Sequence, residues 1–144
     1  MTTRPDGARP ALHKRGATDG FFIEDSQIDD LLDTRILHVG GVGLMNRMDD
    51  SGRTEEILRE AKKRGVITTL DVFASTPADL PKVARLLPYT DYFLPSEEEA
   101  RALSGLTGNR ELAQFLLDRG AARVILTLGA DGAFYRHRDG TEFH

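Results

Sequence analysis

The sequence predicts an α/β protein, a three-layer, doubly wound and mostly parallel sheet with a C-terminal antiparallel hairpin. Two observations support this prediction. Short apolar or β-branched runs alternate three times with segments of helical character, and the links between them are short. After the last helical segment, strand-like runs are separated by glycine-containing turns, which is typical of an antiparallel hairpin. Such a sheet has a Rossmann-like core, with helices expected on both of its faces.

The predicted strands contain the β-branched and apolar runs of the chain, each bounded by glycine, proline or a turn. In chain order they are Ile36–Val39, which should end at Gly40-Gly41, then Val66–Phe73, Tyr92–Leu94, Val124–Leu128 and Ala133–His137, with a last strand after the Asp139-Gly140 turn. No repeat of fixed period is present, so we expect one domain.

The predicted helices are bounded by capping residues at their starts and by glycine or proline at their ends. The first helix takes its N-cap from Asp50, Ser51 or Thr54 and ends before Gly65, and the second runs from Thr76-Pro77 through about Leu87 and is closed by Pro88. The third helix runs from Ser96 to Leu103 and ends at Gly105, and the fourth is capped by Asn109 and ends at Gly120.

Composition excludes several classes of protein. The chain has 144 residues, a formal net charge of -4 and no cysteine, which rules out a disulfide scaffold and thiolate metal sites. Its acidic balance argues against nucleic acid or an anionic membrane as a partner. No apolar run is long enough to cross a bilayer. We therefore expect a cytoplasmic protein.

The N-terminal segment, residues 1–20, differs in composition from the α/β domain expected at 21–144. It is rich in Arg, Gly and Pro and has few large apolar side chains. Burial can therefore offset little of the entropy lost on ordering. We expect the stretch from Met1 to about Pro10 to be mobile.

Ligands of such sheets bind beyond the carboxyl ends of the strands, and one of these ends carries a hydroxyl and three carboxylates in Ser96-Glu97-Glu98-Glu99. Two interpretations remain open. Ser96 and Glu99 have the spacing of a capping box, which would place them for stability alone. Alternatively, Glu99 could hold Mg²⁺ through water beside bound phosphates, because hard oxygen ligands suit that ion.

A second candidate follows the strongest strand, where Thr127 precedes Gly129 and Gly132. Two glycines three residues apart let the backbone approach a ligand closely. A hairpin turn that needs a positive φ at Gly132 would require the same residue without any ligand. The residues alone favour the turn, and its place at the carboxyl edge keeps the binding interpretation open.

Three further features of the sequence bear on a possible site. Asp71 lies late in a buried strand, where an unpaired carboxylate is costly, so we expect it to point toward a cap, an ion or a substrate. The Gly40–Gly43 stretch is a poor match to the dinucleotide loop G-x-G-x-x-G, because the third glycine position is Asn46. The four histidines, His13, His38, His137 and His144, show no spacing typical of a metal site.

Taken together, the segments resemble the central part of the ribokinase-like, or PfkB, family of carbohydrate kinases, over about His13 to His144. The stretches that carry the resemblance are Arg35-Ile36-Leu37-His38-Val39-Gly40-Gly41, Ala61-Lys62-Lys63-Arg64-Gly65-Val66 leading to Asp71, Asp91-Tyr92-Phe93-Leu94-Pro95-Ser96-Glu97-Glu98-Glu99-Ala100, and Val124-Ile125-Leu126-Thr127-Leu128-Gly129-Ala130-Asp131-Gly132-Ala133. The resemblance implies a kinase that uses ATP and Mg²⁺ to phosphorylate a sugar hydroxyl.

The resemblance also implies roles for individual residues. Thr127, Gly129 and Gly132 would line the ATP ribose and phosphates. Ser96 stands where the family has an asparagine near the phosphates, and Glu99 corresponds to its metal-organising glutamate. Asp71 matches a family aspartate on the sugar side, although Phe73 and Ser75 replace the Asn and Arg that often follow it.

Family members also contain a substrate-binding lid and a Gly-Ala-Gly-Asp segment, and the sequence contains neither. That segment supplies the family's general base and its anion hole, so we expect no catalytic residue here and no turnover by this chain alone. The alternative is a non-catalytic α/β module that senses nucleotide or mediates an interaction, and a dehydrogenase fragment that binds NAD ranks third. Strand edges and apolar surface left uncovered also predict self-association.

Overall fold

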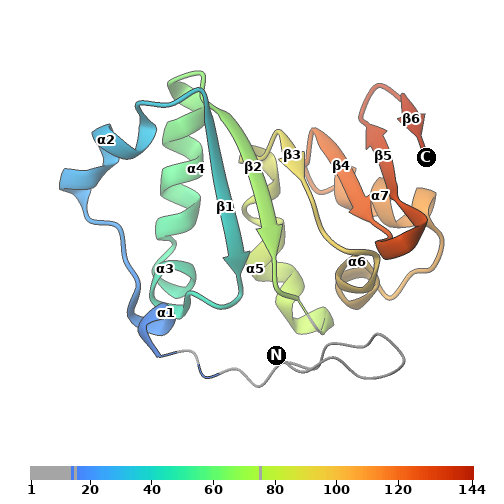
Figure 1. Ribbon diagram of the computed structural model, residues 1–144, viewed down its shortest axis with the longest axis horizontal. Coiled ribbons are helices and arrows are strands. Elements are labelled where there is room, and N and C mark those ends of the chain that lie inside the picture. The colour runs from blue at the N-terminus through green and yellow to red at the C-terminus, as the bar shows by residue number, and fades with distance from the viewer. Residues whose placement is uncertain (1–13, 15, 75) are drawn as a thin grey trace.

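The computed structural model describes residues 14, 16–74 and 76–144, which form one mixed sheet with helices packed against it (Figure 1). The six strands follow one another in the sheet in their chain order, the first four parallel and the last two antiparallel. The strands are β1 (Ile36–Val42), β2 (Ile67–Val72), β3 (Tyr92–Phe93), β4 (Arg123–Thr127), β5 (Ala133–His137) and β6 (Glu142–Phe143). The α/β class, the parallel core and the C-terminal hairpin are therefore confirmed.

The helical elements are short, and several are single 3-10 turns. They are α1 (Ala17–Gly20), η1 (Asp25–Gln27), α2 (Ile28–Leu32), α3 (Asn46–Ser51), α4 (Arg53–Lys63), η2 (Pro77–Asp79), α5 (Leu80–Ala84), η3 (Leu87–Tyr89), α6 (Glu97–Ser104), α7 (Asn109–Leu117) and η4 (Gly129–Asp131). None of the helices in the described part of the chain is both long and apolar enough to cross a membrane.

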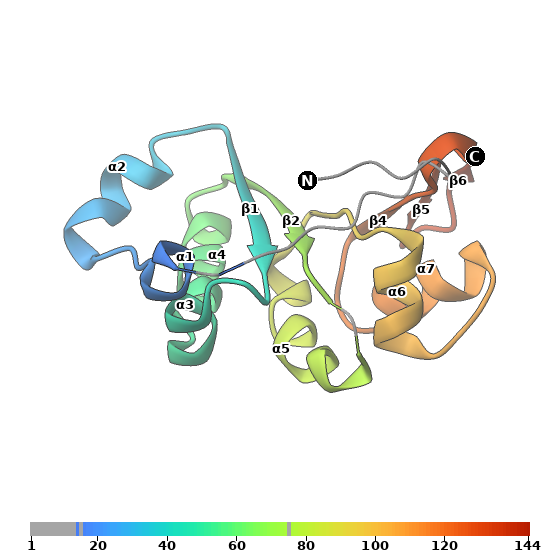
Figure 2. The same cartoon turned by 60° about the horizontal axis from the view of Figure 1, so that its bottom comes forward.

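The helices that connect the parallel strands lie on one face of the sheet. Figure 1 and the turned view in Figure 2 both show α4, α5, α6 and α7 on the same side of the strands. This follows from the strand order, because right-handed crossovers that always advance in one direction place every helix on the same face. Within the described residues, the helical cover is therefore on one face of the sheet instead of the two that we expected.

Side chains alternate along the strands between the two faces. Leu70, Phe93, Val124 and Leu126 point to the helices and are completely buried. The residues between them in each strand point away from the helices. Three of these are large exposed hydrophobic residues in strands near the two edges of the sheet: Ile36, Ile67 and Phe143, with 55%, 42% and 60% of their surface exposed. The face opposite the helices, which we call the open face, is therefore partly apolar.

The first strand and the helix after it begin and end at positions other than those predicted. β1 continues through Gly40 and Gly41 with a register irregularity, and the chain turns only at Gly43. A short helix, α3, already begins at Asn46, and Gly52 in the left-handed conformation separates it from α4. Gly52, the N-cap of α4, has no side chain, and the Ser51 hydroxyl accepts the Arg53 N–H at 3.3 Å, so of the caps expected at this start Ser51 contributes one hydrogen bond.

The second predicted helix is divided into η2, α5 and η3, and Pro88 lies inside η3 instead of closing the helix. Its predicted start is confirmed, because Thr76 forms a capping box with Asp79. Gly108 is the N-cap of α7, so Asn109 is its first helical residue and not its cap. The predictions made for Met1 to Pro10, His13 and Ser75 fall outside the described residues.

Candidate functional site

The N-terminus of α6 is held by a complete capping box. The Ser96 hydroxyl accepts the Glu99 N–H at 3.2 Å, and Glu99 Oε2 accepts both the Ser96 N–H at 2.8 Å and the Ser96 Oγ–H at 2.7 Å. This is the stabilising arrangement that the spacing predicted. All of these bonds to the carboxylate involve one of its oxygens, so Glu99 Oε1 keeps its lone pairs for another partner.

The turn after β4 is exposed and contains two glycines with positive φ. Gly129 has φ 62° and Gly132 has φ 91°, and the turn is closed by the Leu128 N–H, which donates to the Gly132 carbonyl at 2.9 Å. A Cβ placed on either glycine would meet no heavy atom within 4 Å. The backbone conformation therefore explains both glycines, and the space outside them is free for a ligand to approach.

The structure brings these two segments together. Ser96 and Thr127 pair as an isolated parallel bridge, and the Thr127 N–H donates to the Pro95 carbonyl at 3.0 Å. β3 and β4 are neighbours in the sheet (Figure 1), so the α6 N-terminus and the 129–132 turn meet at the carboxyl edge. We call this junction the β3–β4 cradle, formed by Ser96, Glu99, Thr127, Gly129 and Gly132.

Asp71 lies at the carboxyl end of β2, on the other side of β3 from β4. Leu70 and Val72 are buried on the helical face, so Asp71 points to the open face, as Thr127 does. The Asp71 carboxylate is half-buried and accepts the Val72 N–H at 2.9 Å. Asp71 and the β3–β4 cradle therefore share one edge and one face of the sheet.

Sequence reasoning missed one buried carboxylate at the same edge. Asp49 is 1% exposed, and its Oδ2 accepts the Gly43 N–H at 2.8 Å, which fixes the turn after β1. Burial raises the pKa of Asp49, an effect that nearby Lys82 and the Gly43 N–H only partly offset. Nothing in the local pattern distinguished this acid from Asp50, because its burial depends on contacts between segments distant in sequence.

Gly43 is required where β1 ends. Its φ is 98°, and a Cβ added there would lie 2.4 Å from the carbonyl oxygen of Phe73. The Phe73 N–H in turn donates to the Val42 carbonyl at 2.7 Å. These contacts hold the end of β1 against the segment that follows Asp71.

The amino edge of the sheet carries a different polar cluster. Asp91 pairs with Lys62 at the end of α4 and accepts the Thr68 N–H at 2.9 Å. Burial alone would raise the pKa of Asp91, but the bonds from Lys62 and Thr68 outweigh it and lower that pKa. The cluster ties α4 to β2 at the end of the sheet opposite the cradle, so we assign it to stability.

Metal-binding groups are sparse. No group of three or more His, Asp or Glu side chains that could hold an ion occurs among residues 14, 16–74 and 76–144. The His38 Nδ1 lies 2.8 Å from the Thr69 hydroxyl on the open face, and His137 Nδ1 lies 2.8 Å from Asp139 Oδ1. A metal ion at the β3–β4 cradle would therefore need most of its ligands from a bound molecule.

Comparison with known proteins gives a consistent result. The family model described as pfkB family carbohydrate kinase matches residues 2–144. A bifunctional ribokinase/ribose-5-phosphate isomerase A from Fructilactobacillus sanfranciscensis is 37% identical over 90 residues, which are 58% of this chain and 16% of that protein.

Two solved structures have similar folds. A PfkB protein from Polaromonas sp. JS666 matches with a TM-score of 0.64 and 26% identity, over 81% of this chain and 42% of that one. The ribokinase of Arabidopsis thaliana, solved with ribose and ATP, matches with a TM-score of 0.68 and 20% identity, over 85% of this chain and 38% of that one. The chain thus spans less than half the length of each of these relatives.

Proposed function

This chain belongs to the pfkB family of carbohydrate kinases, and on that premise we propose that it is the nucleotide-binding part of a kinase that transfers the γ-phosphoryl group of ATP to a sugar hydroxyl. The observation that carries the proposal is the pairing of Ser96 with Thr127, which joins a helix N-terminus to a glycine turn at the carboxyl edge. The names of the relatives support a sugar kinase: one is a bifunctional ribokinase, and another is a ribokinase solved with ribose and ATP.

The residues of the β3–β4 cradle fit a nucleotide with its phosphates. Thr127 is exposed and offers a hydroxyl, and the open space outside Gly129 and Gly132 allows the backbone to contact a ribose or phosphate directly. At the start of α6 the Glu99 N–H is taken by Ser96, and the N–H groups before it have no partner within the helix, so they can donate to an anion. We propose that Thr127, Gly129, Gly132 and Ser96 bind ATP.

Magnesium fits this site as a companion of the phosphates. Mg²⁺ in kinases is held by one or two carboxylates together with substrate phosphates and water. Glu99 can contribute Oε1 through a water molecule while Oε2 stays in the capping box. The ion, when bound, would neutralise charge on the phosphate oxygens, and Glu99 would orient its water.

The sugar would lie on the Asp71 side of the same edge. Asp71 is half-buried and keeps Oδ2 available for a hydroxyl donor, because its bond to Val72 uses Oδ1. We further propose that the chain alone binds nucleotide without turning over. The Gly-Ala-Gly-Asp segment, which by family resemblance supplies the base and the anion hole, does not occur in the sequence.

A second candidate function is a non-catalytic module that senses nucleotide or mediates an interaction. One observation favours it: the capping box accounts for both Ser96 and Glu99 by helix stability, with no need of a ligand. In that case the chain would keep the family fold but not its chemistry.

The test measures thermal unfolding with Mg-ATP, Mg-ADP and NAD. A ligand at 100 times its Kd stabilises the folded state by about 2.7 kcal/mol, which raises the Tm by several degrees. We expect stabilisation by the adenine nucleotides that is lost in Gly129→Ala, because the new methyl group would occupy the open space outside Gly129 through which a ligand would contact the backbone. The matched control is Gly140→Ala, another exposed turn glycine with positive φ and free space around it.

The outcomes separate the candidates. Stabilisation by ATP in the parent chain and in Gly140→Ala, but not in Gly129→Ala, supports the proposal. Stabilisation by NAD alone contradicts it, and the absence of any shift favours an interaction module. Equal stabilisation in both glycine variants would place the nucleotide elsewhere. Production of ADP from ATP and ribose by this chain alone would refute the proposed lack of turnover.

A further inference from the structure

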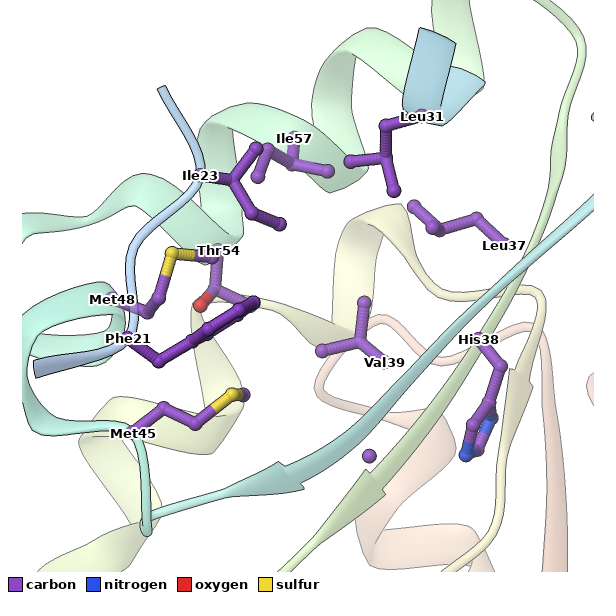
Figure 3. Close-up of a pocket in the computed structure, with 11 residues that line it drawn as sticks. Phe21, Ile23, Leu31, Leu37, His38, Val39, Met45, Met48, Thr54 and Ile57 are labelled. Carbon is purple, nitrogen blue, oxygen red and sulfur yellow. The ribbon is translucent and has the colours of Figure 1, made fainter. Parts of the chain in front are cut away.

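A polar pocket of about 320 Å³ lies at the amino edge of the sheet, the upper edge in Figure 1, where α4 ends and β2, β3 and β4 begin. Lys62 of α4 lines it together with Ile67, Tyr92 and Arg123, which belong to the three strands. The three strand residues point to the open face, because the residue after each of them is buried on the helical face. The cavity between β1 and α4 that Figure 3 shows is lined mainly by hydrophobic side chains, whereas this pocket contains two cations and one carboxylate.

Arg123 is the cation of this pocket that has no anionic partner. Its guanidinium carbon lies 4.8 Å from the centroid of the Tyr92 ring, a cation–π contact that uses no hydrogen-bond acceptor. In the part of the chain that the structure describes, this guanidinium forms no hydrogen bond and no ion pair. A guanidinium carries five N–H donors in one plane, a geometry that matches the two oxygens of a carboxylate. Arg123 can therefore bind a carboxylate through two parallel hydrogen bonds without breaking a hydrogen bond of the chain.

Lys62 is a second cation whose donors are only partly used. Its ammonium group has three N–H donors, and Asp91 Oδ1 accepts one of them. Asp91 Oδ2 accepts the Thr68 N–H at 2.9 Å, so both oxygens of this carboxylate are engaged by the chain. The Lys62–Asp91 pair is neutral as a unit, and the positive charge of Arg123 is left over. A ligand with one negative charge would balance it.

The remaining wall of the pocket has no free backbone donor and one apolar surface. The Gly65 N–H donates to the Lys62 carbonyl at 3.2 Å, and the Val66 N–H donates to the Ala61 carbonyl at 2.9 Å. The backbone at these two positions therefore cannot hold an anion. Ile67 is 42% exposed, so an occupant would be held by side chains at its charged end and would cover Ile67 with an apolar part.

We propose that this pocket binds a small organic carboxylate with an apolar body, in which Arg123 and Lys62 hold the carboxylate and Ile67 packs against the body. Mostly apolar ligands fixed by a few placed polar groups are typical of small-molecule sites. A carboxylate fits better than a phosphate ester, because the pocket has one uncompensated positive charge and the guanidinium fork is planar. The site is independent of the proposed nucleotide function, because it lies at the opposite edge of the sheet and shares no residue with Asp71 or the β3–β4 cradle.

Benzoate and benzamide form a matched pair of probes. They have nearly the same planar shape, but only benzoate is charged. We would titrate each into the full chain with labelled isoleucine methyl groups and follow the NMR signal of Ile67, with Ile23 of the apolar cavity as the reference. We expect benzoate to shift Ile67 and not Ile23, and to bind about tenfold more tightly than benzamide, because hydrogen bonds between charged groups are the stronger ones. Phenyl phosphate should bind more weakly than benzoate.

Arg123→Gln removes the guanidinium and should weaken benzoate about tenfold while leaving benzamide unchanged. The matched control is Arg47→Gln, because Arg47 also lies over an aromatic ring, 4.3 Å from the centroid of Phe22, but does not line the pocket. This control should bind benzoate as the parent chain does, and equal weakening in both variants would overturn the role of Arg123. If Arg123→Gln does not fold, the comparison of benzoate with benzamide in the parent chain decides alone.

Three results with the parent chain would overturn the proposal. Failure of benzoate to shift the Ile67 signal at millimolar concentration would overturn the site. Equal affinities for benzoate and benzamide would overturn recognition by charge. Tighter binding of phenyl phosphate than of benzoate would overturn the assignment to a carboxylate.

Discussion

Replacing Gly43 with alanine should destabilise the chain far more than the same change at another glycine of positive φ. A residue with a side chain costs about 1–2 kcal/mol in this backbone region. The new Cβ would also lie 2.4 Å from the Phe73 carbonyl oxygen, a distance that no side chain tolerates. The neighbour is backbone, so it cannot swing aside as a flexible side chain would.

Relief of this clash requires the two strand ends to separate. That movement would strain the Phe73 N–H to Val42 carbonyl bond of 2.7 Å and the Gly43 N–H to Asp49 bond of 2.8 Å. Each contributes about 1 kcal/mol net. With the backbone term, the expected loss in the free energy of unfolding is about 3–4 kcal/mol, a large part of the 5–15 kcal/mol typical of a domain.

The matched control is Gly65→Ala. Gly65 has φ 75°, and a Cβ there would meet nothing within 4 Å, so only the backbone cost of about 1–2 kcal/mol applies. Urea unfolding followed by far-UV circular dichroism gives both values. If the two variants lose stability equally within about 0.5 kcal/mol, the close approach of Gly43 to Phe73 does not contribute to stability and this prediction is refuted.

Three further predictions concern charge, the cradle and the open face. Because burial raises the pKa of Asp49 above 3.8, the folded state binds its proton more tightly than the unfolded chain, so this contribution to stability is lost as the pH rises through the raised pKa. Asp49→Asn should abolish this loss of unfolding free energy with rising pH, measured by urea unfolding from about pH 3 to 7. Asp91 has a lowered pKa, so its contribution to stability is lost as the pH falls, and Asp91→Asn should remove that opposite trend. An unchanged pH dependence of stability in either variant would contradict the pKa shift assigned to that residue. Ser96→Ala should cost about 1 kcal/mol through loss of the cap, while Ser96→Asn should keep the cap and tighten ATP binding measured by calorimetry; weaker ATP binding in the asparagine variant would argue against a phosphate contact at this position. The exposed Ile36 and Ile67 should promote self-association in light scattering, and the double lysine variant should reduce it; a parent chain that is strictly monomeric at high concentration would refute this.

Features set by neighbouring residues could be predicted from the sequence. The capping box at Ser96 and Glu99, the left-handed Gly105 after α6 and the hairpin after Thr127 all depend on residues within a few positions of one another. Their hydrogen bonds form inside one turn, so spacing and residue type suffice. The four segments that resemble the carbohydrate kinases could be recognised for the same reason.

Features set by packing could not be predicted in this way. β1 continues past Gly40 and Gly41 to Val42, which pairs with Val72 of β2, and the buried Asp49 accepts the N–H of Gly43 from the turn after β1. The Ser96–Thr127 pair joins the N-cap of α6 to the end of β4, and it depends on an order of strands in the sheet that the sequence does not state. The one-sided helical cover follows from the same order of the strands. Local propensity thus determined the helices, the strands and their caps. Contacts between distant segments decided which of these elements lie side by side, and only that packing brings the β3–β4 cradle and Asp71 to one edge of the sheet.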